Sequence, residues 1–180
     1  HRDLHSFPTR RSSDLYVLMG KSMLGRQLED VDRILHFATA RFGAPRGSFL
    51  GVARGPLGPL MLHAQAVTGA FKGLALIASP LSYRSMVVTP AYSPAWVHAA
   101  VPSALTAYDL PDLAACMAPN RLLLVKPRDA MDKPADDSSV EQDTAVVRRA
   151  FAQAGEPSQL RILRGESDQA LSTVVDALVR

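Results

Sequence analysis

Short runs of consecutive apolar residues alternate with segments of helical periodicity, and this alternation constrains the fold more than any other feature of the sequence. The runs occupy residues 48–53, 73–78, 121–125 and 160–163. The runs at 73–78 and 121–125 do not alternate between apolar and polar residues, which is typical of strands covered on both faces of a parallel sheet. Strands that alternate with helices predict an α/β fold with a mostly parallel sheet, right-handed crossovers and helices on both faces.

The helices are predicted from apolar residues spaced three and four positions apart. The first spans residues 26–42 and ends before Gly43; its apolar stripe is Leu28, Val31, Ile34, Leu35, Ala38 and Phe42. A second helix is expected over 60–67. A third begins with the capping pattern of Ser138 and Glu141, and its inward side is Val140, Thr144, Val147, Phe151 and Ala154. The last carries Leu171, Val174, Val175 and Leu178.

The composition bounds the classes of function. A chain of 180 residues with 47% hydrophobic residues can bury the core of one domain. Its formal net charge of +3 is spread without a run of lysine or arginine, which argues against nucleic acid as a partner. A membrane-spanning helix needs roughly 18 consecutive apolar residues, and the sequence has no such stretch. Cys116 is the only cysteine, and we predict no disulfide, no metal site and no cofactor.

The first fifteen residues, HRDLHSFPTRRSSDL, have neither helical nor strand periodicity. They resemble the translation of a sequencing adapter, and we expect them to be foreign to the protein rather than a basic arm for nucleic acid. The native domain is then expected to span residues 16–180, with its own N-terminal region missing. Without that region, the compartment in which the protein works is not predicted, and neither is its oligomeric state.

Residues 80–110 interrupt the alternation and are predicted to form an insertion at the end of a strand. This segment contains four prolines, the only tryptophan and three of the four tyrosines. In open α/β sheets, ligands bind outside the carboxyl ends of the strands. The aromatic side chains Tyr83, Tyr92, Trp96 and Tyr108, together with Arg54, are therefore candidates to line a pocket. The alternative is a surface loop that packs on itself.

Gly51-Val52-Ala53-Arg54-Gly55 has the spacing of a nucleophile elbow, the G-x-S-x-G turn that raises a serine above the sheet. The literal motif places Ala53 at the nucleophile, whereas the spacing to the following helix places Gly55 there, and we prefer Gly55. Neither residue carries a hydroxyl or a thiol, which nucleophilic acyl transfer requires. In the preferred register the next residue is Pro56, which has no backbone N–H to donate to an oxyanion.

Several segments in the same order resemble α/β hydrolases of the bacterial acetyl xylan esterase and dienelactone hydrolase kind. The resemblance extends from about Gly20 to the C-terminus. Besides the elbow and the helix before it, the matching segments are Leu-Met-Leu-His-Ala at 60–64, Ser-Tyr-Arg-Ser at 82–85, Tyr-Asp-Leu-Pro-Asp-Leu at 108–113 and Leu-Leu-Val-Lys-Pro-Arg-Asp at 123–129. The resemblance implies the C-terminal part of one α/β-hydrolase domain.

The resemblance also implies where the other catalytic residues of the family stand. Asp129 follows the strand after which the family has its catalytic acid, although the side chain of a loop aspartate also commonly caps its own turn. The family's histidine comes last in the chain, but no histidine follows His98 here. The loop expected to hold it reads Arg-Gly-Glu-Ser-Asp at 164–168. His36 and His63 lie within predicted helices and are expected to be structural.

These observations predict a hydrolase-fold protein that is inactive by the Ser-His-Asp mechanism and binds a small-molecule ester or carbohydrate, or serves as a scaffold. The alternative is an active hydrolase with a metal or an acid pair drawn from Asp109, Asp112, Asp129 and Asp132. A sequencing error in the elbow is a third explanation. Two phosphate-binding interpretations are disfavoured: a dinucleotide turn at 53–58, which Pro56 and Pro59 interrupt, and a phosphate loop ending at Gly20-Lys21-Ser22.

Overall fold

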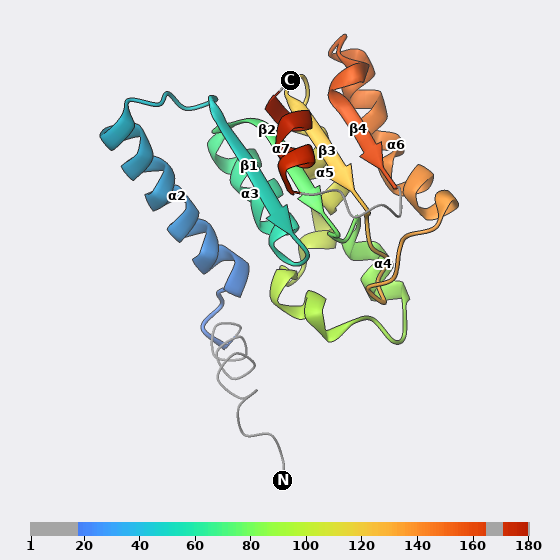
Figure 1. Ribbon diagram of the computed structural model, residues 1–180. Helices are drawn as coiled ribbons and strands as arrows, with labels where there is room; N and C mark the ends of the chain where they lie inside the picture. Colours follow the sequence, from blue (N-terminus) through green and yellow to red (C-terminus); the bar gives the residue numbers. More distant parts are fainter. Residues whose placement is uncertain (1–17, 165–170, 180) are drawn as a thin grey trace.

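The computed structural model describes residues 18–164 and 171–179, and it contains a four-stranded parallel sheet in the order β1-β2-β3-β4 (Figure 1). The strands are β1 (Phe49–Arg54), β2 (Phe71–Ile77), β3 (Arg121–Val125) and β4 (Leu160–Leu163). Leu74 of β2 pairs with Gly51 of β1 and with Leu122 of β3. The parallel sheet predicted from the alternating segments is confirmed, and β3 and β4 have the predicted bounds.

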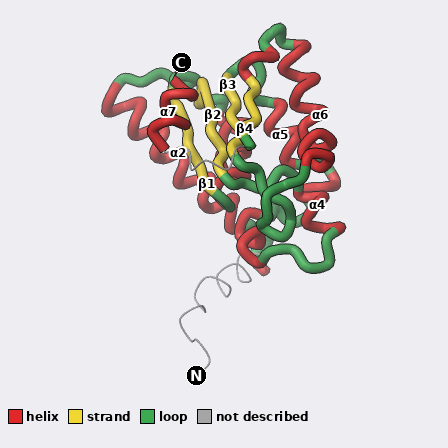
Figure 2. The backbone as a smooth tube through the Cα atoms, turned by 45° about the vertical axis from the view of Figure 1, so that its right-hand side comes forward, coloured by secondary structure: helices red, strands yellow, loops and turns green. Residues whose placement is uncertain are grey.

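Helices cover both faces of this sheet, as predicted. One face packs against α3 (Leu57–Thr68), α5 (Leu110–Ala115) and α6 (Asp137–Gln153), and the other against α7 (Leu171–Val179), while α2 (Met23–Phe42) packs on α3. The first core includes Leu74, Leu122 and Phe151; the second joins Leu123 to Val174. Figure 2 shows the same layers from a second direction. Continuous apolar strands are therefore explained, because successive side chains enter opposite cores.

Strand β1 differs from its neighbours because it lies at the edge of the described sheet. Its side chains alternate: Gly51 and Ala53 are buried, whereas Leu50 and Val52 are 43% and 40% exposed. Within residues 18–164 and 171–179, no strand pairs with its outer edge. Unpaired edges expose backbone hydrogen-bonding groups to any further strand.

The helix starts depart from the predictions in three places, one of which is α3, which begins at Leu57 and not at residue 60. Helix α2 begins at Met23, three residues early, because the Ser22 side chain accepts a hydrogen bond from the Gly25 amide. The predicted capping pattern of Ser138 and Glu141 is wrong. Asp136 is the N-cap of α6, since its carboxylate accepts hydrogen bonds from the Ser139 amide and from two serine hydroxyls. Serine and aspartate both suit an N-cap, and the aspartate comes first in the chain.

The apolar stripes are confirmed in their centres but not at every position. In α6, Val140, Thr144, Val147 and Phe151 are buried as predicted, but Ala154 is exposed beyond the end of the helix. In α2, Leu35 is buried, whereas Ile34 and Phe42 are 66% and 72% exposed. Among the described residues, nothing packs over this outer side of α2. Helix α5 was not predicted; the capping box of Asp109 and Asp112 starts it.

The insertion at 80–110 contains α4 (Tyr83–Val88) and two 3₁₀ turns, Pro94–Ala99 and Ala104–Thr106. It crosses the carboxyl ends of the strands and returns to α5 (Figure 1). None of the described helices is long and apolar enough to cross a membrane. The predictions for residues 1–15 and for the loop at 165–168 fall outside the described residues.

Candidate functional site

The turn between β1 and α3 contains Gly55, whose φ of 57° lies in the left-handed region. The strand ends at Arg54 and α3 begins at Leu57. A Cβ built at Gly55 would meet no atom within 4 Å, so the left-handed backbone, and not crowding, favours glycine here. Ala53 lies inside β1 and is 6% exposed. Of the two residues considered for the elbow, Gly55 is therefore the one in the turn.

A close approach between Gly58 and Ser79 fixes this turn against the loop that follows β2. A Cβ on Gly58 would stand 2.3 Å from Ser79 Oγ and 2.6 Å from Ser79 Cβ. The Ser79 hydroxyl donates to the carbonyl oxygen of Gly55 at 3.0 Å and is buried. Ser79 is thus the hydroxyl beside the elbow that the sequence interpretation missed, and its proton is engaged in holding the turn.

Pro56 is the N-cap of α3 and has no N–H. The first backbone N–H after Gly55 is therefore that of Leu57. The next one, that of Gly58, donates to the carbonyl oxygen of Gly55 at 3.1 Å. An oxyanion at the elbow would need donors at about 2.7–3.1 Å, and removing one typically costs about a hundredfold or more in rate. The turn therefore presents neither a nucleophilic oxygen nor the amide that follows it in the motif.

Asp129 lies in the loop after β3, where its carboxylate closes a local turn. Its Oδ1 accepts hydrogen bonds from the amides of Met131 at 2.9 Å and Lys133 at 2.8 Å. Its backbone carbonyl accepts a bond from the indole N–H of Trp96 at 3.2 Å. This arrangement gives Asp129 a structural task as the cap of its own loop and as the anchor of the insertion.

His63 joins α3 to the end of the insertion. Its Nδ1 lies 2.7 Å from the carbonyl oxygen of Pro59, and its Nε2 lies 2.8 Å from the hydroxyl of Tyr108. A carbonyl can only accept, so Nδ1 carries the proton and Tyr108 donates to Nε2. Burial lowers the pKa of His63, although the hydrogen bond to Pro59 acts in the opposite direction. The lowered pKa favours the neutral ring. His63 is accordingly a structural residue, as expected.

The aromatic residues of the insertion serve mainly to pack it against the sheet. Tyr83 is 4% exposed and its hydroxyl donates to the carbonyl of Ala99 at 2.6 Å; burial, more than the neighbouring Tyr108 and Asp109, raises its pKa. Trp96 is 2% exposed, whereas Tyr92 is 47% exposed. Arg54 is exposed at the end of β1. The structure thus does not bring these residues together around one pocket.

A hollow lies between α4, the loop after β3 and the start of α6, and we call it the α4–α6 pocket. It has a volume of about 380 Å³. Its charged and amide-bearing lining residues are Arg84, Arg128, Asp129, Asp136, Gln142 and Asp143. Ligand pockets commonly have volumes of roughly 300–1,000 Å³. The pocket lies at the carboxyl end of the sheet, where α/β folds bind ligands.

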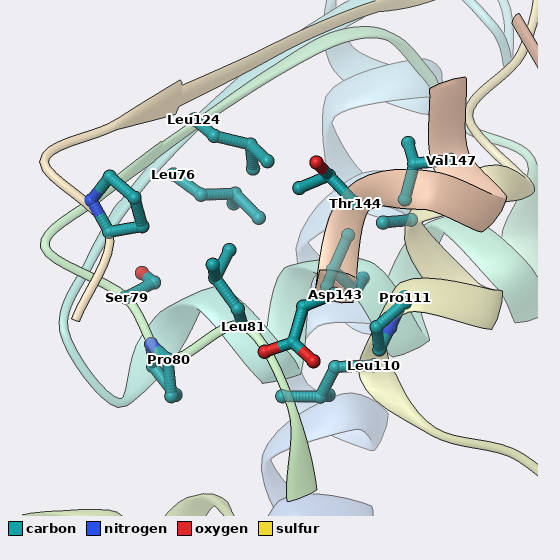
Figure 3. A pocket seen from close by; sticks show the side chains of 13 residues that line it. Leu76, Ser79, Pro80, Leu81, Leu110, Pro111, Leu124, Asp143, Thr144 and Val147 are labelled. Carbon is teal, nitrogen blue, oxygen red and sulfur yellow. The ribbon is translucent and has the colours of Figure 1, made fainter. Parts of the chain in front are cut away.

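Asp143 lines this pocket and also a smaller apolar one beside it. The apolar pocket has a volume of about 20 Å³, and Figure 3 shows the Asp143 carboxylate pointing from α6 toward Leu81 and Leu110. Burial raises the pKa of Asp143 to about 6; Asp109 and then Asp136 act in the same direction and Arg84 opposes them. The sequence interpretation missed this residue. The sequence feature that could have identified Asp143 is its position between Val140 and Val147, on the inward side of α6.

The other carboxylates proposed as an acid pair or metal site are engaged locally. Asp109 accepts hydrogen bonds from the Ser82 hydroxyl at 2.7 Å and from the amides of Tyr83 and Leu110, both at 2.6 Å. Asp112 accepts from the Asp109 amide at 2.8 Å, and Asp132 lies in the turn that Asp129 caps. Within the described part of the chain, no group of three or more His, Cys, Asp or Glu residues is placed to hold a metal ion.

The parallel sheet of four strands, the helices on both faces and the strand-turn-helix unit at Gly55 define an α/β fold. No protein-family profile and no curated protein matches the sequence. The structure is similar to a crystal structure from Bacteroides fragilis NCTC 9343 described as a "putative acetyl xylan esterase", with a TM-score of 0.68 and 16% sequence identity. The match covers 90% of this chain and 41% of that one, so this chain spans less than half of its length. The resemblance predicted from the sequence is confirmed for the fold.

Proposed function

We propose that this protein is an α/β-hydrolase-fold protein that does not hydrolyse esters by the Ser-His-Asp mechanism. The observation that carries the proposal is the turn at Gly55 and Pro56, which has no hydroxyl, no thiol and no amide directly after the elbow residue. A nucleophile and an oxyanion donor are both needed there for acyl transfer. One missing group would slow such an enzyme; the absence of both removes the reaction's two main requirements from one turn.

The remaining polar groups support the same proposal. The acid position, Asp129, has its Oδ1 occupied by two backbone amides. His63 has both ring nitrogens engaged, and no histidine follows His98 in the sequence. Ser79, the hydroxyl beside the turn, donates to Gly55 O and has no base among its hydrogen-bond partners. His63 and the hydrogen-bond partners of Ser79 therefore supply no base at the elbow.

The proposal predicts that the protein neither reacts with a fluorophosphonate probe nor hydrolyses p-nitrophenyl acetate above the buffer rate. Gly55→Ser has room for its Cβ, and we expect it to fold with a loss of about 1 kcal/mol from the left-handed backbone. It should remain unlabelled, because Pro56 still lacks an N–H and no base is added. Labelling would be measured by mass spectrometry of tryptic peptides. A labelled serine in the unmodified protein would contradict the proposal, with Ser79→Ala identifying whether Ser79 is responsible.

A binding role is the positive part of the proposal, and the α4–α6 pocket is its site. Arg84, Arg128 and Gln142 offer donors, Asp143 offers an acceptor, and apolar groups such as Met131 lie among them. Positive and negative side chains nearly balance, which favours a neutral ligand that both donates and accepts hydrogen bonds. A small carbohydrate, or an ester of one, has this chemistry. The likeness to a protein described as a "putative acetyl xylan esterase" supports the same class of ligand.

Binding is tested by titrating the protein with xylobiose and with its acetylated form, following the amide resonances of residues around the pocket. We expect saturable shifts that Gln142→Leu weakens by about tenfold, the effect of losing roughly 1.4 kcal/mol of hydrogen bonding. Glu141→Gln is the matched control, because Glu141 is adjacent on α6 and its side chain is 67% exposed. Shifts that are absent, or equally affected by both variants, would argue for a scaffold role instead.

A further inference from the structure

Asp143 is a partly exposed residue whose carboxyl group lines an apolar gap. It projects from α6 toward Leu81 of the loop after β2 and toward Leu110 and Pro111 of α5 (Figure 3). The gap has a volume of about 20 Å³, which is sufficient for about one water molecule. No hydrogen bond links the Asp143 side chain to another described residue. An ionised carboxylate there would lack part of the solvation that it has in water.

The charged groups that act on Asp143 come from α5, α4 and the start of α6. Asp109 stands at the start of α5, Arg84 on α4, and Asp136 two turns earlier on α6. Asp109 cannot turn away, because three backbone amides and the Ser82 hydroxyl hold its carboxylate. Arg128 and Asp129 border the same α4–α6 pocket from the loop after β3. Burial and the negative charges of Asp109 and Asp136 oppose ionisation of Asp143, whereas Arg84 favours it.

We propose that Asp143 is a pH-responsive latch between α6, α5 and the loop after β2. Neutral, its carboxyl group occupies the apolar gap and holds these elements together. Ionised, it leaves the gap and turns into the α4–α6 pocket toward Arg84, so that the gap loosens and the pocket gains a negative charge. The latch itself requires no ligand; only its effect on a bound ligand rests on the binding role proposed above.

The direction of the pH dependence follows from proton linkage. The pKa of Asp143 is raised from 3.8 to about 6, so the folded protein holds a proton that the unfolded chain releases between these values. The stabilising contribution of Asp143 is therefore fully present below pH 3.8 and is lost as the pH rises through about 6. His63, whose pKa is lowered by burial, acts in the opposite direction, and only a comparison of variants separates the two.

The latch is tested by following the methyl resonances of Leu81 and Leu110 by NMR from pH 4.5 to 8. We expect both residues to report one protonation step with a midpoint at about pH 6, as burial predicts. Arg84→Gln should raise that midpoint by about half a unit or more, because the positive charge of Arg84 lowers the pKa of Asp143. Asp143→Asn should abolish the step, and Glu141→Gln, which neutralises an exposed carboxylate on the same helix, should leave it unchanged.

Three results would overturn the latch: a midpoint near 4, a step that survives Asp143→Asn, or a midpoint indifferent to Arg84→Gln. The midpoints of the unmodified protein and of Arg84→Gln still test the latch if Asp143→Asn does not fold. Because no ligand is added, failure of the latch is distinguishable from failure of carbohydrate binding, which the xylobiose titration measures separately.

Discussion

Replacement of Trp96 by alanine is expected to lower the free energy of unfolding by about 3–5 kcal/mol, the usual cost of emptying a large aromatic site. Trp96 is among the largest fully buried side chains and is 2% exposed. Its indole N–H also donates to the carbonyl of Asp129, which ties the insertion to the loop after β3. Denaturant titration followed by circular dichroism gives the change directly, provided that the slope of the transition is unchanged.

Two further variants separate packing from hydrogen bonding at this position. Trp96→Phe keeps most of the apolar volume and loses the N–H, so a loss of about 1 kcal/mol is expected from the hydrogen bond with a further contribution from the smaller ring. Tyr92→Ala, in the same insertion but 47% exposed, should change stability by less than about 0.5 kcal/mol. If Trp96→Ala were no more costly than Tyr92→Ala, the insertion would not be anchored by Trp96.

The elements that sequence analysis predicted well are those whose burial is uniform along the element. Strand β3 reads Arg-Leu-Leu-Leu-Val and is buried on both faces, so its pattern has one interpretation. The inward side of α6 is likewise complete, from Val140 to Phe151. Helix α5 was missed because six residues are too short to show a helical period. The exposure of Ile34 and Phe42 was missed because periodicity locates an apolar face without showing what covers it.

The candidate site also has features that the sequence predicts and features that it does not. The turn at Gly55 follows from local spacing, because a strand, a glycine with positive φ and a helix are contiguous in the sequence. The partners of Asp143 and of Ser79 do not follow from it. Asp109 and Arg84 approach Asp143 from α5 and α4. Ser79, in the loop after β2, contacts Gly58 at the start of α3. Contacts between residues so far apart in sequence depend on the packing of whole elements, which no local pattern specifies.

Gly58→Ala is expected to lower the free energy of unfolding by about 2–3 kcal/mol, although alanine is the better helix former. The new Cβ would stand 2.3 Å from Ser79 Oγ and 2.6 Å from Ser79 Cβ, distances that require the loop after β2 to move. That movement also breaks the hydrogen bond from the Ser79 hydroxyl to Gly55 O. The cost is therefore overpacking plus a lost buried hydrogen bond, and thermal or denaturant unfolding would measure it.

A double-mutant cycle identifies the partner in this contact. Ser79→Gly alone should cost about 1 kcal/mol, whereas in the Gly58→Ala background it should restore most of the loss, giving a coupling energy of about 1–2 kcal/mol. Gly55→Ala, three residues earlier in the same turn, meets no atom within 4 Å and should show only the cost of its φ of 57°. Additive effects of Gly58→Ala and Ser79→Gly would place the strain elsewhere. Strong coupling would mean that the shape of the elbow is maintained by packing against the loop after β2, independently of any catalytic residue within the turn.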